Sequence, residues 1–508
     1  MIRRGIGCLL ALSLLLSLTG CVQITKESNP DLATLPPASV DYHVPDGDET
    51  IGSAQYRVLY VQDANELHLT PRMARTEPGE LCEVAEALAL RQLEAENQRR
   101  TEQNAESRPL TLYGDRPLEI SGGICTVNLG SSALQMAPSD FYKFCVTLTT
   151  TLCDLDEISF VNVLVADQSV GLDITGSLAM GSLTAHPNEN LPVLWEQMEA
   201  KRTPLGEELA NTPLNAMATL YYPLQEGRGM ACEGRILTFE GQTPQQLATG
   251  LLQELDETLI ERGRPQVTPL LLHDPLVSEL EDGGRLITLS FQANLEERLE
   301  EANLDLACTV AAMTYTLTTF IPGVAAVCVR MGEQPMTELR SMRFGSISIL
   351  GGLVRRELFR DYLMGSTIVY LRRGDRLTPC EHTLFWHHAD RCREQLISLM
   401  EGPTLEEQEM GILATLPAGL QEEDILGIAA EGETLLVNLS DNFREAIEQQ
   451  GPEAEMMLCY SMVNTLCRNT GLRRMCFFFE GEQVEQIAGT LYWAGEFLYN
   501  PALDEQTV

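Results

Sequence analysis

Lysine is nearly absent from this chain of 508 residues. Only Lys26, Lys143 and Lys201 occur, arginine supplies the rest of the 35 basic residues, and 73 acidic residues bring the formal net charge to −38. A surface this acidic repels the phosphates of nucleic acids and of anionic lipids. Nucleic acid is therefore excluded as a partner, whereas charge alone says nothing about the fold.

Long apolar runs and the common enzyme motifs are missing as well. After the first twenty residues, no segment has 18 consecutive apolar residues, so the sequence predicts no membrane-spanning helix. There is no Gly-x-Ser-x-Gly nucleophile elbow, and none of the lysines completes a Ser-x-x-Lys motif. Paired carboxylates carry no information in a chain this acidic. We therefore expect a protein that is not an enzyme.

One pattern, in contrast, occurs three times. Each copy opens with a short apolar run around a tyrosine, at Val58-Leu59-Tyr60, Thr219-Leu220-Tyr221 and Ile368-Val369-Tyr370. An alternation ending in leucine follows at Val127-Asn128-Leu129, Ile287-Thr288-Leu289 and Val437-Asn438-Leu439. A Thr-Leu pair comes next, at Thr151-Leu152, Thr316-Leu317 and Thr465-Leu466. The near-constant spacing indicates three copies of one domain of roughly 140 residues, too long for a solenoid repeat.

Each copy is expected to contain a strand, a helix, a second strand, a long helix and a third strand. Apolar periodicity predicts first helices over residues 80–91, 243–259 and 389–400, and long helices over 140–153, 305–320 and 453–469. Final strands are expected over 158–165, 324–331 and 475–479. The predicted fold class is α+β, with three tandem domains over 55–185, 213–350 and 366–508, each a small sheet with two helices on one face.

The N-terminal residues are typical of an exported lipoprotein. Arg3 and Arg4 precede an apolar stretch over 6–18, and Leu18-Thr19-Gly20-Cys21 resembles a bacterial lipobox. We expect residues 1–20 to be a signal peptide, Cys21 to carry the lipid, and residues 21–54 to form a flexible tether. The expected location is the extracytoplasmic face of the cell membrane. The alternative is an ordinary signal peptide with an incidental cysteine.

Twelve cysteines remain besides Cys8 and Cys21. An exported chain with this number invites a disulfide framework. Three of them, however, occupy corresponding positions in the long helices (Cys145, Cys308 and Cys459), and two stand in the apolar runs that follow (Cys328 and Cys476). Such positions are typical of small core residues, so mostly reduced and buried thiols are expected.

Two local motifs could indicate a ligand. The densest group of possible metal ligands is Cys380, His382, His387, His388 and Cys392. Zinc favours such side chains, but the spacing matches no standard zinc finger and the other copies lack the group. We expect no metal and no cofactor, and a cluster that does not converge on one point. The run from Glu226 to Cys232 lacks the last glycine of a dinucleotide fingerprint, and a hairpin turn explains it better.

The third copy resembles a known family. The residues Leu396 to Pro403, Leu416 to Gly419, Leu436 to Ser440 and Thr465-Leu466 resemble the GerMN domain of GerM-type lipoproteins from spore-forming bacteria. The resemblance extends over 366–508, with weaker likeness over 214–350 and 55–183. It implies a non-enzymatic role, because GerMN domains are similar to ring-building modules that help to assemble envelope-spanning complexes. No catalytic residues are implied.

Two function classes follow. The first is a lipid-anchored assembly or scaffold protein of an envelope, sporulation or germination complex, with protein partners and the membrane as its contacts. The second is a lipoprotein that binds a peptide or a cell-wall fragment in a cleft between domains. A hydrolase with an unrecognised site is a third, weaker reading. Extended apolar or strand-edge surfaces between the domains favour assembly, whereas a deep polar pocket favours ligand binding.

Overall fold

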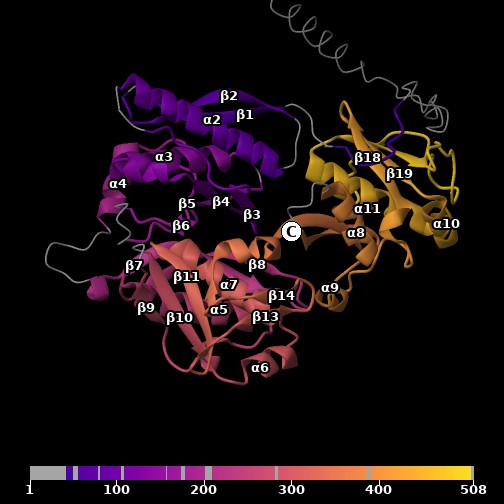
Figure 1. Ribbon diagram of the computed structural model, residues 1–508. Coiled ribbons are helices and arrows are strands. Elements are labelled where there is room, and N and C mark those ends of the chain that lie inside the picture. The colour runs from indigo at the N-terminus through magenta and orange to yellow at the C-terminus, as the bar shows by residue number, and fades with distance from the viewer. Residues whose placement is uncertain are drawn as a thin grey trace, which may run out of the picture.

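The computed structural model describes residues 42–49, 55–63, 65–77, 81–103, 108–155, 157–172, 178–200, 209–280, 284–385 and 391–504. The expected signal peptide and Cys21 lie outside these residues. Among the helices that are described, none is long and apolar enough to cross a membrane. Helices and small sheets follow one another in three sets, which we call repeats 1, 2 and 3 (Figure 1).

The three repeats share one order of elements. Repeat 1 contains β1 (Gln55–Gln62), β2 (Leu69–Thr76), α2 (Leu81–Glu102), β3 (Leu118–Ser121), β4 (Ile124–Leu129), α3 (Pro138–Leu152), β5 (Phe160–Val165), β6 (Gln168–Ser169) and α4 (Leu191–Glu199). Repeat 2 contains β7 (Leu214–Pro223), β8 (Met230–Phe239), α5 (Pro244–Glu261), β9 (Leu276–Glu279), β10 (Arg285–Phe291), α6 (Leu295–Glu301), α7 (Leu306–Phe320) and β11 (Val324–Met331). It ends with β12 (Gln334–Pro335), β13 (Glu338–Ser341), β14 (Gly345–Ser348), β15 (Leu353–Val354) and the 3-10 helix η5 (Arg356–Tyr362).

Repeat 3 contains β16 (Met364–Arg373), β17 (Arg376–Phe385), α8 (Arg391–Glu401), α9 (Leu405–Glu409), β18 (Ile425–Glu431), β19 (Thr434–Leu439), α10 (Asp441–Gln450), α11 (Pro452–Thr470), β20 (Arg474–Phe479) and β21 (Phe497–Leu498). Short 3-10 turns connect some of these elements in each repeat, at η2 (Ser131–Gln135), η3 (Leu209–Asn211), η4 (Thr268–Leu270) and η6 (Glu422–Asp424). The expected α+β fold class is confirmed.

Each repeat builds two sheets where one was expected, and repeat 2 adds a third from the pair β13–β14. An antiparallel hairpin opens the repeat, as β1–β2, β7–β8 and β16–β17. A second sheet follows, in which an antiparallel pair is joined by a parallel strand after the long helix: β4 pairs with β5, β10 with β11 and β19 with β20. The sequence predicts a single strand where the hairpin stands, and the returning strand of the hairpin was missed. The turn expected between Glu226 and Cys232 does join β7 to β8.

The tyrosine and threonine markers meet in every repeat. The Oγ1 of Thr151 accepts a hydrogen bond from the backbone N–H of Tyr60 at 3.1 Å, and Thr316 and Thr465 do the same for Tyr221 and Tyr370, both at 2.9 Å. A buried strand edge needs a partner for each unpaired N–H, and a threonine on the long helix supplies it. The constant distance between the two markers along the chain therefore reflects one contact that fixes the long helix against the hairpin.

The third marker separates the two faces of the second sheet. In β4, Val127 and Leu129 are fully buried against the helices, and Asn128 between them points to the opposite side, since strand side chains alternate. We call that opposite side the outer face of the sheet. The inner faces hold the apolar cores, whereas the outer faces of repeats 1 and 3 meet other parts of the chain.

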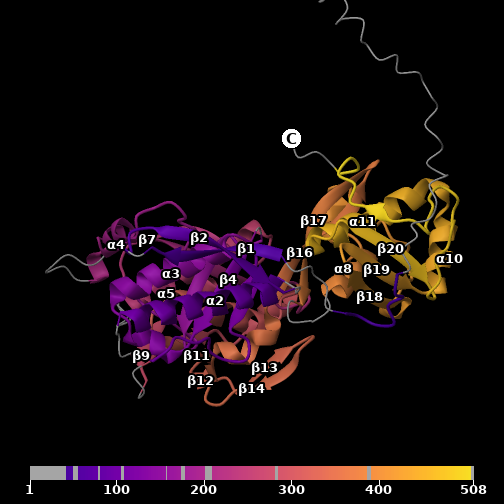
Figure 2. The same cartoon turned by 90° about the horizontal axis from the view of Figure 1, so that it is seen from above.

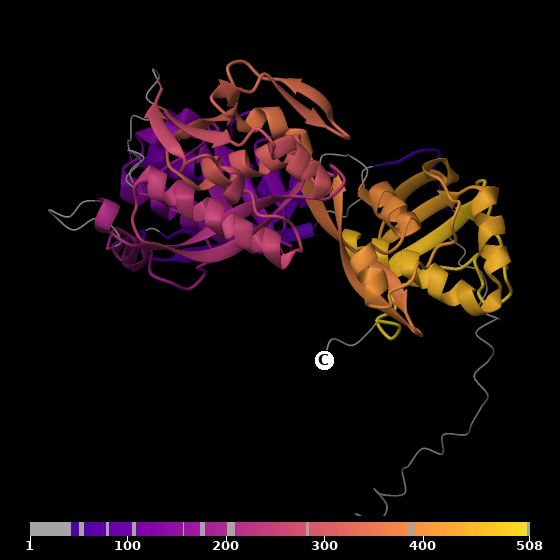
Figure 3. The same ribbon diagram turned by 90° about the horizontal axis from the view of Figure 1, so that it is seen from below.

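The repeats are not arranged in a line. Repeat 1 packs on repeat 2, and repeat 3 lies beside them beyond β16 (Figures 1 and 2). Residues 42–49, part of the stretch expected to be a flexible tether, lie along the sheet of repeat 3, where the indigo segment meets the yellow repeat in Figure 3. Glu49 donates its backbone N–H to the carbonyl oxygen of Ile428 at 2.8 Å. This part of the tether is thus held by hydrogen bonds.

Candidate functional site

The outer face of the repeat 1 sheet is covered by the hairpin of repeat 2. The Nδ2 of Asn162 in β5 donates to Oγ1 of Thr219 in β7 at 2.9 Å, and Ser182 links the same two side chains. The approach is close enough to require glycine: a Cβ on Gly122, whose φ is +53°, would come within 2.1 Å of the carbonyl oxygen of Cys232. The two repeats therefore meet face to face, by β-sheet against β-hairpin.

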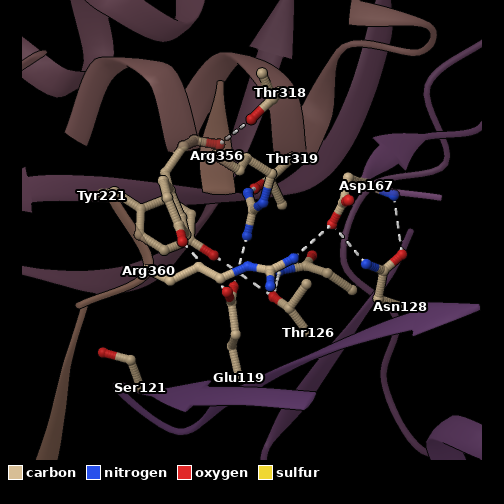
Figure 4. A network of polar contacts seen from close by, with 12 residues as sticks. Glu119, Ser121, Thr126, Asn128, Asp167, Tyr221, Thr318, Thr319, Arg356 and Arg360 are labelled. Atoms are coloured by element: carbon tan, nitrogen blue, oxygen red, sulfur yellow. Dashed lines mark hydrogen bonds and ion pairs between the residues drawn. The ribbon is translucent and has the colours of Figure 1, made fainter. Parts of the chain in front are cut away.

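A buried ion pair lies at the centre of this contact (Figure 4). The Nη2 of Arg356 in η5 is 2.7 Å from Oε2 of Glu119 in β3, and the two side chains are 4% and 11% exposed. Arg356 also donates to Oγ1 of Thr319 at 2.5 Å and stacks its guanidinium 3.8 Å from the ring centre of Tyr315. Tyr315 in turn donates its hydroxyl to Glu119 at 3.2 Å. Every member of the network has a partner, as a buried charge requires.

Burial and charge act in opposite directions on Arg356. Removal from water lowers the pKa of the guanidinium. The carboxylate of Glu119 and the side chain of Tyr315 raise it by more than this, so the pKa of Arg356 lies above its ordinary value. The arginine stays charged at every accessible pH. The positive charge of Arg356 is therefore a permanent feature of the contact between repeats 1 and 2.

A second arginine of η5 extends the contact to the marker asparagine. Arg360 donates to Oδ1 of Asp167 at 3.3 Å and to Asp115 at 2.6 Å, and Nδ2 of Asn128 also donates to Asp167 at 2.7 Å (Figure 4). Asn128 therefore faces the border with repeat 2 and reaches it through Asp167.

The outer face of the repeat 3 sheet is covered by residues 42–49. Tyr42 and Val44 pack on an apolar patch formed by Leu436, Cys476 and Phe478. The Nδ2 of Asn438, the marker that corresponds to Asn128, donates to the carbonyl oxygen of Pro45 at 3.1 Å.

Charged and backbone contacts hold the same segment. Asp48 accepts from the guanidinium of Arg393 at 2.6 and 2.9 Å, and Ile428 donates its N–H to the carbonyl oxygen of Gly47 at 3.2 Å. The outer face thus binds an extended segment in repeat 3 and a hairpin in repeat 1.

Three members of the possible metal cluster of repeat 3 lie among the described residues. Cys380 and His382 lie on β17, Cys392 lies on α8, all three are buried, and His387 and His388 fall outside the described residues. The Nδ1 of His382 is 2.7 Å from Oγ of Ser398, and its Nε2 is 3.1 Å from Oε2 of Glu407. Within the part of the chain that the structure describes, no group of three or more His, Cys, Asp or Glu side chains could hold a metal ion.

His382 lies between Ser398 and Glu407, as the histidine of a hydrolase triad lies between its serine and its carboxylate. The surroundings of this group, however, differ from those of an active site. Ser398 is 4% exposed on the core side of α8, so a substrate has no access to its hydroxyl. Glu407 also accepts the backbone N–H of Thr404 at 2.7 Å, at the start of α9. The three side chains therefore tie α8 and α9 to β17.

The thiols are not activated either. Burial, and then the nearby carboxylate of Glu407, raise the pKa of Cys380 to about 12. A nucleophilic cysteine needs the opposite shift, because the thiolate is the reactive form. All twelve described cysteines are free, nine of them are buried, and Cys145, Cys308 and Cys459 have no exposed surface. Their positions agree with the expected role as small core residues.

Two cavities among the described residues each lie within one repeat. A cavity of about 490 Å³ in repeat 3 is lined by the end of α11 and by β21, with Arg468, Leu472 and Tyr499 among its residues. A cavity of about 300 Å³ in repeat 2 lies between α5 and the loop around His273. Neither is the cleft between domains that the ligand-binding alternative expects.

Comparisons with known proteins point to one family. Residues 378–485 match the Germane family model, which is described as sporulation and spore germination. This match confirms the expected relation to GerM-type proteins, and it covers most of repeat 3. No curated protein sequence matches the chain.

Three solved structures show distant similarity. The tandem GerMN domains of the sporulation protein GerM from Bacillus subtilis are 13% identical, with 57% of this chain and 100% of that chain covered and a TM-score of 0.22. A putative lipoprotein from Clostridium perfringens is 15% identical, covering 28% of this chain and 93% of that one, with a TM-score of 0.19. The first GerMN domain of the same GerM protein is 16% identical over 25% and 91% of the two chains, with a TM-score of 0.19.

Proposed function

Because repeat 3 carries a domain of the Germane family of sporulation and spore germination, we propose that this protein is a non-enzymatic assembly component of an envelope complex in those processes. A lipid on Cys21 holds it at the extracytoplasmic face of the cell membrane. Its partners are the membrane, through this anchor, and the proteins of the complex.

The observation that carries the proposal is the use of the outer sheet face. The same face binds a hairpin through Asn162 in repeat 1 and an extended segment through Asn438 in repeat 3. Sheets pack face to face in many proteins, with side chains of the two faces interdigitating. A fold that repeats a surface with this property is suited to joining proteins.

The chemistry of the buried groups gives no support to an enzyme. The histidine of the Ser398, His382 and Glu407 group is enclosed, and the pKa of the Cys380 thiol is raised rather than lowered. The ligand-binding alternative places its ligand in a cleft between domains, whereas the cavities of about 490 and 300 Å³ lie inside repeats 3 and 2. Assembly is the function that the described surfaces support best.

The anchor is tested by labelling cells with a fatty-acid probe. The wild-type chain should take up the label and sediment with membranes, and Cys21→Ala should abolish both. Cys8→Ala is the matched control, because Cys8 lies inside the expected signal peptide and should leave labelling unchanged. Persistent labelling of the Cys21→Ala chain would contradict the proposed anchor.

The assembly role is tested by purifying the tagged chain from membranes of the native host during sporulation. We expect defined envelope proteins to be recovered in constant ratio to the wild-type chain. The same proteins should be lost when Cys21→Ala removes the chain from the membrane. Recovery of the chain alone from cross-linked sporulating membranes would contradict an assembly role.

A further inference from the structure

The outer sheet face of repeat 2 differs from its two counterparts because it is open to solvent. Four side chains form one row across this sheet, since Leu276 pairs with Thr288, Thr288 with Cys328, and Cys328 with Leu353. Leu276 and Leu353 are 51% and 41% exposed, and the two residues between them are half-buried. Thr288 is the marker that corresponds to Asn128 and Asn438. The surface that is covered in repeats 1 and 3 is thus an exposed, largely apolar row in repeat 2.

The hairpins also have an outer face, which is the face turned away from the apolar core of their own repeat. This face is covered in repeats 2 and 3 and open in repeat 1. The hairpin of repeat 2 is covered by the repeat 1 sheet, as described above. That of repeat 3 is covered by residues 499–504: the hydroxyls of Tyr370 and Tyr499 are 3.1 Å apart, and Leu377 donates its N–H to the carbonyl oxygen of Leu503 at 2.9 Å.

The hairpin of repeat 1 remains exposed on its outer face. Tyr56 and Met73 are 70% and 66% exposed there, and the half-buried Val58 pairs with Met73 across the two strands. Exposed apolar groups on neighbouring strands are typical of interaction sites. The chain therefore carries one open sheet face, in repeat 2, and one open hairpin face, in repeat 1.

We propose that the open sheet face of repeat 2 binds the repeat 1 hairpin of a second copy of this chain. The contact repeats between molecules the sheet-against-hairpin packing that joins repeats 1 and 2 within one molecule. Both surfaces carry exposed apolar side chains, with Arg75 beside Tyr56 on the hairpin, and the contact buries Tyr56 and Met73 against Leu276 and Leu353. This inference rests on the proposed assembly function and names the surface and the partner.

The contact joins two different surfaces, so it can be repeated from copy to copy. Such head-to-tail contacts give closed rings or open filaments, according to the rotation between neighbours. Repeat 3 takes no part, because its sheet face is occupied by residues 42–49 and its hairpin face by residues 499–504. Repeats 1 and 2 form the body of the assembly, and repeat 3 lies outside the contact.

Photo-cross-linking of the purified full-length chain tests the proposal. The variant Tyr56→p-benzoylphenylalanine is mixed with nitrogen-15-labelled wild-type chain in detergent, so that adducts between molecules are identified by mass. We expect them to map to residues 276–290 and 324–354 of the partner copy. The reciprocal variant at Leu276 should give adducts in residues 55–76. Leu405, 78% exposed on α9, is the control position and should give none.

A second experiment introduces a charge on the open sheet face of repeat 2. Leu276→Glu places a carboxylate without a partner in the proposed contact and should lower the adduct yield from position 56 about tenfold. Leu405→Glu should leave that yield unchanged. Adducts that stay within one molecule, or that do not respond to Leu276→Glu, would overturn the self-association. Adducts in host membranes from positions 56 and 276 to other proteins alone would overturn it too, but would leave the assembly function standing.

Discussion

The buried ion pair between repeats 1 and 2 allows a quantitative prediction. The variant Glu119→Ala leaves the guanidinium of Arg356, which is 4% exposed, without its carboxylate. Loss of one partner of a buried pair destabilises a protein by about 3–5 kcal/mol. Thr319 and the ring of Tyr315 still contact the guanidinium, so we expect a loss near the lower limit, about 3 kcal/mol. The double variant with Arg356→Met should recover most of this loss, because no unpaired charge remains.

The same contact contains a matched control. Arg116 and Asp361 form an ion pair of 2.6 Å between repeats 1 and 2, but their side chains are 34% and 63% exposed. The variant Asp361→Ala should therefore change stability by less than about 1 kcal/mol. Hydrogen exchange followed by mass spectrometry measures the opening free energy of β3, β8 and η5 in each variant. Equal effects of Glu119→Ala and Asp361→Ala would refute the reasoning from burial.

Three further predictions concern single repeats. Thr316→Val should destabilise repeat 2 by about 1–3 kcal/mol in urea unfolding, because the N–H of Tyr221 loses its acceptor. Thr318→Val in the same helix should have a small effect, since that hydroxyl bonds only within its helix. In repeat 3, burial raises the pKa of Glu455, but hydrogen bonds from Trp493 and three backbone N–H groups lower it below 4.5. Glu455→Gln should destabilise the protein at pH 7. Its difference from wild type in the free energy of unfolding should shrink as the pH falls below about 4, because a carboxylate whose pKa is lowered in the folded state stabilises the protein only while it is ionised.

Elements with strong local periodicity could be predicted from the sequence. The strand expected over 324–331 is β11, and the helix expected over 305–320 is α7 with Asp305 as its cap. Thr243 caps α5 with proline at the first helical position, as its Thr-Pro pair predicts. In these elements the apolar spacing and the capping residues point to the same structure, so no distant contact was needed to recognise them.

The returning strand of each hairpin was missed because its pattern has another reading. In β17, Cys380, His382 and Leu384 are buried at every second position, which is the period of a strand. The residue types suggested metal ligands instead. The alternation of buried residues was the signal that could have identified β17.

The surfaces between the repeats could not be predicted in this way. Glu119 and Arg356 are 237 positions apart, and Arg356 lies in the stretch 350–366 that was expected to separate two domains. The segment 42–49 is short and polar, and its place on repeat 3 depends on the small size of Gly427, where a Cβ would meet the carbonyl oxygen of Pro45 at 2.6 Å. Such contacts are set by tertiary packing, which leaves no period in the sequence.

The mass of the protein extracted from host membranes tests the central claim most directly, namely that the open surfaces of repeats 1 and 2 build an assembly. Mass photometry of the wild-type chain in detergent should show particles of two or more chains. Leu276→Glu should shift them to single chains, and Leu405→Glu should not. Single wild-type chains at all protein concentrations, or large particles unaffected by Leu276→Glu, would contradict the account.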